Sequence, residues 1–290
     1  MTDLYIGLAI MSCVSLLVLL CTVKWTRPMK TRAVTLTGIL AAMLLLAYLR
    51  FAWKTALLAT VLPFSSVVIL SNWFPPAAAF LAGITWTHGY GTGTRRVLFG
   101  LTLYLIAFYS SVDPLLGQPP ECRNRWQMRR DFPYPMARQT SGYSCTAAAA
   151  ATLLRINGIQ AEESEMVQLC LTRNGTTWQG LYRGLKLKTA GLPFRIEVIE
   201  CPVQELENSL PGPAILSVGI DPSQPYLPEY VEEKGWDPGM RHSVVLLGFQ
   251  PNFDGVVVAD PSVGFEPWTT RDIQTLWRGR AVCLVPTDSR

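Results

Sequence analysis

The sequence predicts an α+β domain that follows an all-α transmembrane bundle. Residues 1–112 contain eight basic residues and one acidic residue, whereas residues 113–290 contain 17 basic and 20 acidic residues. The second part first shows helical periodicity and then, after Gly191, the alternation of strands. Helices followed by antiparallel strands are typical of an α+β arrangement. The net charge of +4 does not indicate nucleic-acid binding, because the excess positive charge lies between apolar runs.

Four apolar runs in the first part are expected to cross a membrane. They are residues 5–23, 33–49, 55–73 with a continuation at 77–86, and 97–112. About 20 apolar residues in a helix cross a hydrocarbon core of about 30 Å. The Pro75-Pro76 pair could instead split the third run into two short segments, which would give five. The runs contain almost no acidic residue that could serve a transport pathway, so residues 1–112 are expected to be an anchor.

The basic residues predict the orientation of the anchor. Four of them lie in the first loop, 24–32, which favours a cytoplasmic position for that loop. With four spans the following domain faces the outer side, whereas five spans would place it in the cytoplasm. Charge bias favours four spans, because Arg95 and Arg96 then also lie inside. Asp3 stands where a signal peptide would have its basic region, so a signal peptide is not indicated.

The soluble part is expected to begin after a linker. Residues 113–136 are rich in Pro, Arg and Gln and form the predicted linker, and residues 137–290 form the domain. Helices are predicted at 146–156, 162–171, 177–190 and 203–210, with Thr177 as a helix N-cap. Strands are predicted at 194–199, 214–220, 242–249, 256–259 and 281–285, with a hairpin turn at 252–255.

Two residues of this domain could form a thiol–imidazole pair. The chain has two histidines, and His88 belongs to the membrane part, so a histidine base in the domain must be His242. Cys145 begins an alanine-rich helix, where the helix dipole and free backbone N–H groups favour a thiolate. Either residue alone could equally be structural: a buried cysteine at a helix start or a solvated histidine at a strand end.

Two further residues could complete a catalytic site. Asp260 ends the strand that the hairpin brings back beside His242, so its carboxylate could hold the imidazole. Before Pro261 it could also simply begin a turn. Gln139, six residues before Cys145, could donate its amide to a developing oxyanion.

Taken together, these motifs resemble peptidase family C39, the papain-like proteases fused to bacteriocin-exporting ABC transporters and their stand-alone relatives. The shared features are Gln139-x5-Cys145 before an alanine-rich helix, Gly175-Thr176, His242-Ser-Val-Val, Ala259-Asp260-Pro261, and the closing segment 272–279. The resemblance spans about residues 138–284. It implies a papain-like domain with Cys145 as nucleophile, His242 as base, Asp260 as orienting acid and Gln139 as oxyanion donor.

The resemblance also implies a peptide or protein substrate, often cut after a Gly-Gly pair in a leader peptide, beside the lipid bilayer of a bacterial plasma membrane. A separate membrane transporter is a further expected partner, and no nucleic acid is expected.

Two departures from the family pattern stand out. Thr146 replaces the glycine that usually follows the cysteine of the family, and residues 221–240 form an unusual segment rich in Pro, Glu and aromatics. This segment is interpreted either as a loop over the cleft or as a passive insertion.

Other activities find less support in the sequence. No phosphate-binding motif G-x-x-x-x-G-K-[ST] occurs, and Cys122, Cys170, Cys201 and Cys283 show no C-x-x-C spacing, so neither a nucleotide cofactor nor a zinc site is expected. The prediction is therefore a cysteine-type peptidase without cofactor or metal. The alternatives are a non-catalytic peptide-binding module of the same fold and an acyl transferase that uses the same residues.

Overall fold

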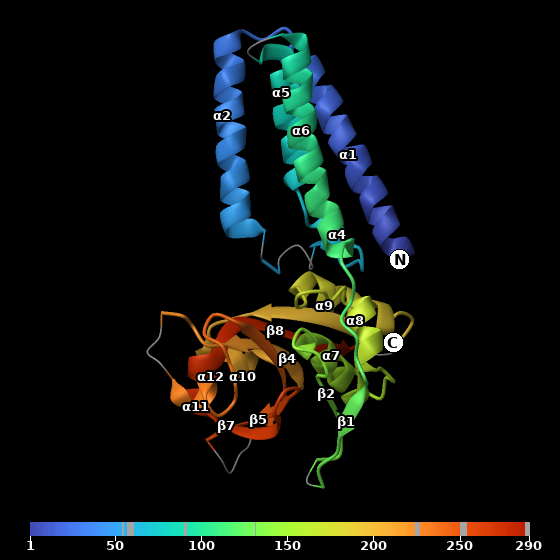
Figure 1. Ribbon diagram of the computed structural model, residues 1–290, viewed down its shortest axis with the longest axis vertical. Coiled ribbons are helices and arrows are strands. Elements are labelled where there is room, and N and C mark those ends of the chain that lie inside the picture. The colour runs from blue at the N-terminus through green and yellow to red at the C-terminus, as the bar shows by residue number, and fades with distance from the viewer. Residues whose placement is uncertain are drawn as a thin grey trace. The chain divides into compact units, whose positions relative to one another are not determined.

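The computed structural model describes residues 1–53, 55–56, 61–89, 92–130, 132–223, 227–249 and 254–287. They form two compact units, Met1–Leu116 and Gly117–Arg290 (Figure 1).

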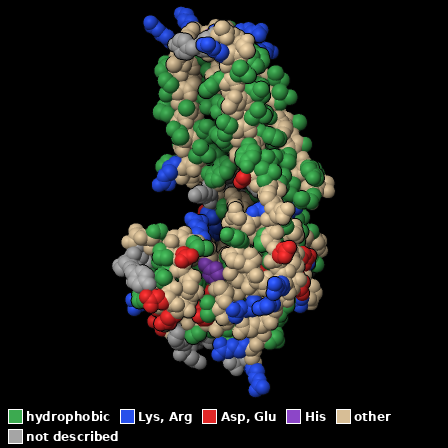
Figure 2. All heavy atoms as spheres, in the orientation of Figure 1, with side chains coloured by type: hydrophobic (Ala, Val, Ile, Leu, Met, Phe, Trp, Pro, Cys, Tyr) green, Lys and Arg blue, Asp and Glu red, His purple; other side chains and the backbone are tan. Residues whose placement is uncertain are grey.

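The first unit consists of helices. Its elements are α1 (Thr2–Thr26), α2 (Thr31–Ala47) with a π-helical turn η1 (Tyr48–Ala52), α4 (Val67–Leu70), α5 (Phe74–His88), α6 (Gly93–Val112) and a 3-10 turn η2 (Asp113–Leu115). Hydrophobic side chains cover most of the visible face of these helices (Figure 2). Such a surface is unusual for a helix bundle in water but normal for one in lipid.

Small residues let α1 and α5 pack closely. A Cβ added at Gly83 of α5 would lie 2.8 Å from the Cβ of Thr22 on α1, so glycine is needed at this crossing. The hydroxyls of Thr26 and Thr87 are 2.8 Å apart, and His88 Nε2 lies 2.8 Å from the carbonyl oxygen of Thr26. His88 therefore has a packing role between two helices.

Three helical segments of the described chain are long and apolar enough to cross a membrane: Thr2–Thr26, Thr31–Ala52 and Val67–His88. The third run was expected to be mainly residues 55–73, but the long helix of this region is α5, which begins at Phe74. Pro75 and Pro76 lie in the first turn of α5, where a missing backbone N–H costs no helical hydrogen bond. The fourth predicted run forms α6. Its first turns carry Arg95 and Arg96, and α6 is not one of the three segments that are long and apolar enough to cross a membrane.

The second unit begins with a short strand pair and three helices. These are β1 (Arg125–Gln127), antiparallel to β2 (Met136–Arg138), followed by α7 (Cys145–Ile156), α8 (Glu163–Leu169) and α9 (Trp178–Lys188). The three helices match their predicted positions, and the Thr177 side chain caps α9 by accepting a hydrogen bond from the backbone of Gly180. Ala147–Ala151 of α7 are completely buried, which allows this helix to lie close to β2, β4 and β5.

A six-stranded antiparallel sheet forms the rest of the unit, beside the helices α7–α9 (Figure 1). Its strands are β3 (Phe194–Glu200), β4 (Ala214–Gly219), β5 (Arg241–Phe249), β6 (Gly255–Asp260), β7 (Gly264–Thr269) and β8 (Trp277–Pro286), in the order β3-β8-β4-β5-β6-β7. Short helices η3 (Val203–Glu205), α10 (Leu206–Ser209), α11 (Pro228–Val231) and α12 (Thr270–Leu276) accompany it. Trp268, Leu216 and Val244 belong to the buried core of the sheet. The predicted α+β class, with helices first and an antiparallel sheet afterwards, is confirmed.

Three details differ from the sequence prediction or lie beyond the described residues. The edge strand β7 was not predicted, because Pro267 interrupts its pattern; proline is tolerated there since an edge strand leaves backbone N–H groups unpaired. The segment 113–136, predicted as a linker, contains β1 and lies mostly within the second unit. Residues 252 and 253 of the predicted hairpin turn at 252–255 lie outside the described residues, and β5 and β6 are neighbouring antiparallel strands.

Candidate active site

The candidate nucleophile, Cys145, is the first residue of α7. It is preceded by the loop 140–144, which is held by a carboxylate from the next helix. Glu163 of α8 is completely buried, and it accepts hydrogen bonds from the backbone N–H of Thr140 (2.7 Å), from the Thr140 hydroxyl (2.7 Å) and from the Ser144 hydroxyl (2.6 Å). Glu163 thus positions the residue directly before the cysteine. Sequence reasoning did not find this role, because a glutamate in the first turn of a helix usually faces solvent.

The candidate base, His242, lies near the start of β5, and Asp260 ends the neighbouring strand β6. The two strands pair Val245 with Ala259, and a register shift follows between Leu246 and Gly248. His242 Nε2 is 2.8 Å from Asp260 Oδ1. The adjacency expected from the hairpin therefore brings these two side chains into direct contact.

Asp260 is fully buried and its charge is compensated locally. Its Oδ1 accepts hydrogen bonds from the Ser262 backbone N–H (2.7 Å) and hydroxyl (2.6 Å), in addition to His242. Burial raises the pKa of this carboxyl, but the hydrogen bond and charge of His242, together with Ser262, outweigh burial and lower it. Asp260 is therefore an anion at neutral pH.

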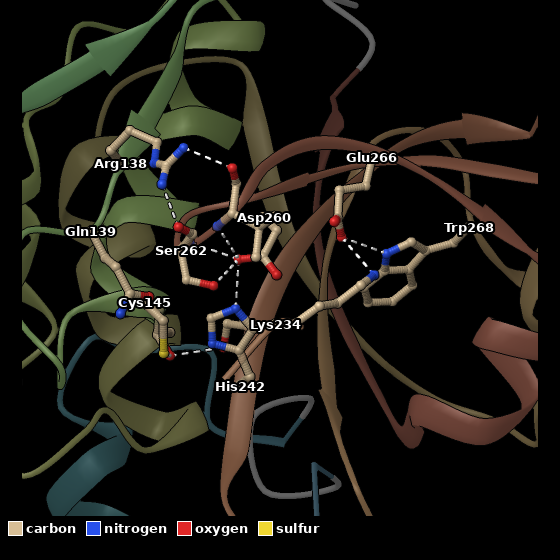
Figure 3. Close-up of polar contacts among 12 residues, drawn as sticks. Arg138, Gln139, Cys145, Lys234, His242, Asp260, Ser262, Glu266 and Trp268 are labelled. Atoms are coloured by element: carbon tan, nitrogen blue, oxygen red, sulfur yellow. Dashed lines mark hydrogen bonds and ion pairs between the residues drawn. The ribbon is translucent and has the colours of Figure 1, made fainter. Parts of the chain in front are cut away.

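Cys145 and His242 influence one another strongly. The sulfur points toward the His242 ring, whose opposite side faces Asp260 (Figure 3). Burial raises the pKa of the Cys145 thiol, but a hydrogen bond with His242 and the charge of that ring lower it below its ordinary value. Burial lowers the pKa of His242, but hydrogen bonds with Asp260 and Cys145 and their negative charges raise it well above its ordinary value. Both shifts favour a thiolate–imidazolium pair.

The other thiols of the second unit lack this environment. All seven cysteines are free. Burial raises the pKa of Cys170 and Cys283 to about 12, and it also raises the pKa of Cys122 and Cys201. Cys145 is thus the thiol of this unit that is poised to ionise. Among the described residues, no group of three or more His, Cys, Asp or Glu side chains could hold a metal ion.

Gln139 lies beside Cys145 in Figure 3, directly after β2. Its backbone N–H donates to the carbonyl of Pro261 (2.9 Å), and its side-chain amide lies 3.4 Å from the carbonyl oxygen of Ser141. The amide therefore reaches the loop that precedes the nucleophile. A hydrogen bond of this length is weak, and the amide oxygen Oε1 is buried without a hydrogen-bond partner among the described residues.

Arg138 is a site residue that sequence reasoning missed. Its guanidinium donates to Gln127 Oε1 (2.8 Å), to the carbonyl of Val263 (2.9 Å) and to the carbonyl of Ser262 (Figure 3). Arg138 thereby connects the end of β2, next to Gln139, with the loop after β6. In that loop, Ser262 donates hydrogen bonds to Asp260. An arginine at the end of a short strand gives no signal in the sequence that distinguishes it from a surface residue.

Residues 227–240 pack on the sheet; they belong to the segment 221–240, which the sequence leaves open as a loop over the cleft or a passive insertion. Tyr230 and Trp236 belong to the buried core, and the Tyr230 hydroxyl donates to Asp272. The Trp236 ring lies 5.0 Å from the His242 ring and 5.9 Å from that of Trp268, centroid to centroid. The Trp236 ring therefore packs against the imidazole at an interplanar angle of 59°.

A salt bridge ties this segment to the edge strand. Lys234 Nζ lies 3.1 Å from Glu266 Oε2 on β7, and the same carboxylate oxygen accepts a hydrogen bond from Trp268 Nε1 at 3.0 Å (Figure 3). The pair is largely shielded, since the two side chains are 20% and 17% exposed. The lysine therefore helps to fix the segment that carries Trp236.

Comparison with known proteins places the second unit in a family. The model of the peptidase C39 family matches residues 133–289, more than half of the chain. A stretch of 47 residues is 49% identical to an uncharacterized protein of Methanothermobacter marburgensis; it covers 16% of the chain and 33% of that protein, so the chain spans about a third of this curated relative.

Solved structures similar to the chain include two peptidase domains. One is a double glycine motif protease from an AMS/PCAT transporter in complex with the leader peptide, with 17% identity, a TM-score of 0.42, and coverage of 53% of this chain and 92% of that one. Another is the peptidase domain of Streptococcus ComA, a bifunctional ABC transporter involved in quorum sensing, with 22% identity, a TM-score of 0.42, and coverage of 53% and 99%. On the match of the family model, the chain belongs to the peptidase C39 family.

Proposed function

We propose that the protein is a membrane-anchored cysteine peptidase whose nucleophile is Cys145. One observation carries the proposal: the thiol at the head of α7 faces an imidazole that a buried carboxylate holds from its other side. Ionised in this way, sulfur is a strong nucleophile at neutral pH. Membership of the peptidase C39 family supports peptide bonds as the target.

The proposed reaction uses each of these groups in turn. The Cys145 thiolate attacks the carbonyl carbon of the scissile bond, and the Gln139 amide donates to the oxyanion that forms. As the C–N bond breaks, His242 gives its proton to the departing amine. The acyl group stays on Cys145 as a thioester. His242 then takes a proton from water, whose oxygen attacks the thioester and releases the new carboxyl terminus. Asp260 orients the ring and stabilises its protonated form throughout.

The first unit is proposed to be the membrane anchor of the catalytic unit. Its apolar helices support insertion. If α1, α2, α5 and α6 all cross, the basic segment 24–32 around the turn between α1 and α2 lies in the cytoplasm, and the catalytic unit lies on the opposite side. A leader peptide presented beside a membrane transporter is the proposed substrate.

Peptide cleavage tests this function directly. The full-length protein in detergent micelles is incubated with a synthetic library of leader-like peptides that carry Gly-Gly pairs, and products are identified by mass spectrometry. We expect new carboxyl termini that disappear when the protein is first treated with iodoacetamide. An added amine acceptor separates two outcomes: free acids indicate hydrolysis, and amides indicate acyl transfer. No cleavage of any peptide by the untreated protein would contradict the proposal.

Selective alkylation tests the thiolate–imidazolium pair. We expect iodoacetamide at pH 6 to label Cys145 before the other four cysteines of the second unit, since its pKa is lowered whereas burial raises theirs. In His242→Ala the thiol should return toward its ordinary pKa, and labelling at pH 6 should slow about 100-fold. His88→Ala, in the other unit, is the matched control and should label like the wild type. Equal rates in wild type and His242→Ala would show that the pair is absent.

A further inference from the structure

Two hydroxyl groups meet between the helix of the nucleophile and the strand of the base. Thr146 directly follows Cys145 on α7, and Ser243 directly follows His242 on β5. The oxygens Thr146 Oγ1 and Ser243 Oγ are 2.8 Å apart, the distance of a good hydrogen bond. This contact therefore links the positions next to the two reacting side chains.

Thr146 Oγ1 also lies 3.9 Å from the Cys145 sulfur. This distance suits a weak hydrogen bond to neutral sulfur, and such a bond shortens and strengthens when the acceptor carries a negative charge. Thr146 is only 7% exposed, so its hydroxyl depends on protein partners. One hydroxyl has a single proton and two lone pairs. Ser243 can donate to Thr146, which leaves the Thr146 proton free to point at sulfur.

We propose that Ser243 and Thr146 form a hydroxyl relay that donates to the ionised Cys145 sulfur. The inference rests on the proposed function, because it assigns a role in preparing that nucleophile. The relay also gives a reason for the departure at residue 146: a glycine there would offer no hydroxyl to either partner. Thr146 is then a positioning residue for the nucleophile, and Ser243 acts through Thr146.

The relay acts together with the charged groups around the sulfur. His242 of β5 faces the thiol, with Asp260 of β6 behind it, and the backbone of Ser243 also contacts the thiol. Glu163 of α8 is bonded to Ser144, the residue before the cysteine. The charge of His242 is expected to be the larger influence, and the relay adds one neutral donor to it.

The pH profile of alkylation measures the relay. The rate of Cys145 modification by iodoacetamide is followed from pH 4 to 9 in the full-length protein, with the Cys145 peptide quantified by mass spectrometry. In Thr146→Val, which keeps the shape but loses the hydroxyl, the midpoint should move to higher pH by about half to one unit, a three- to tenfold slower reaction below the midpoint. Thr146→Ser, which keeps the hydroxyl, should retain the wild-type midpoint.

Ser243→Ala gives an independent reading if the valine variant folds poorly, as thermal melting would show. It should move the midpoint in the same direction by a smaller amount, and combining it with Thr146→Val should add nothing further, because both remove the same relay. Unchanged midpoints in Thr146→Val and Ser243→Ala would overturn the relay, as would a Thr146→Ser midpoint shifted as far as that of valine. These readings need no peptide cleavage, so failure of the relay and failure of the peptidase function are separate results.

Discussion

Replacing Cys145 by serine is expected to abolish peptide cleavage, with kcat/KM at least about 10⁴-fold below the wild type. A serine hydroxyl does not ionise beside an imidazole as a thiol does, so the attacking anion is lost before the reaction begins. The geometry around it stays in place, since Glu163 still holds the preceding loop and Asp260 still holds His242. The measurement is the initial rate on the peptide that the wild type cleaves fastest.

Cys201→Ser is the matched control for this prediction. Cys201 is a free, half-buried cysteine whose pKa burial raises, so it has no activated thiol to lose. Its serine variant should cleave at the wild-type rate, and both variants should melt near the wild-type temperature. Cleavage retained in Cys145→Ser would rule out this thiol as nucleophile and favour a non-catalytic peptide-binding role for the fold.

Removing the Asp260 carboxylate is expected to have the next largest effect. In Asp260→Ala the ring of His242 loses both its hydrogen-bond partner and the negative charge that stabilises its protonated form, so kcat/KM should fall about 1,000-fold. Asp260→Asn keeps an oxygen that can accept from the ring and from Ser262 but removes the charge, so we expect a loss of about 10- to 100-fold.

The pH profile separates the two contributions of Asp260. Cleavage needs the thiolate, which is lost as the pH falls through the lowered pKa of Cys145, and the imidazolium, which is lost as the pH rises through the raised pKa of His242. Because the Asp260 charge raises the pKa of His242, Asp260→Asn should move the alkaline limb to lower pH. Asp254→Asn, at an exposed carboxylate bonded to Thr270, should leave the profile unchanged. An unmoved alkaline limb in Asp260→Asn would contradict the proposed role of the charge.

Part of the candidate site around His242 can be predicted from the sequence. Periodicity and turn residues predict that a helix begins at Cys145 and that a strand ends at Asp260. A hairpin turn then predicts that this strand lies beside that of His242. Helices, strands and turns are local properties of the chain. The register shift between Leu246 and Gly248 could not be read this way, although it affects how the ends of β5 and β6 meet. Backbone pairing between strands depends on the whole sheet, and a single strand does not encode it.

The α+β class, the apolar character of residues 1–112, and the candidate thiol and imidazole can all be read from the sequence. Hydrophobic periodicity, helix signals and a scarcity of histidines carry that information locally. The folded structure adds contacts that the sequence does not predict. Trp236 packs against the imidazole, Glu163 and Arg138 hold the loops of the site, and the Thr146 and Ser243 hydroxyls meet. Most of these contacts join residues far apart in the sequence, up to 125 positions. All of them depend on how separate segments pack together, for which the pattern of one segment holds no signal.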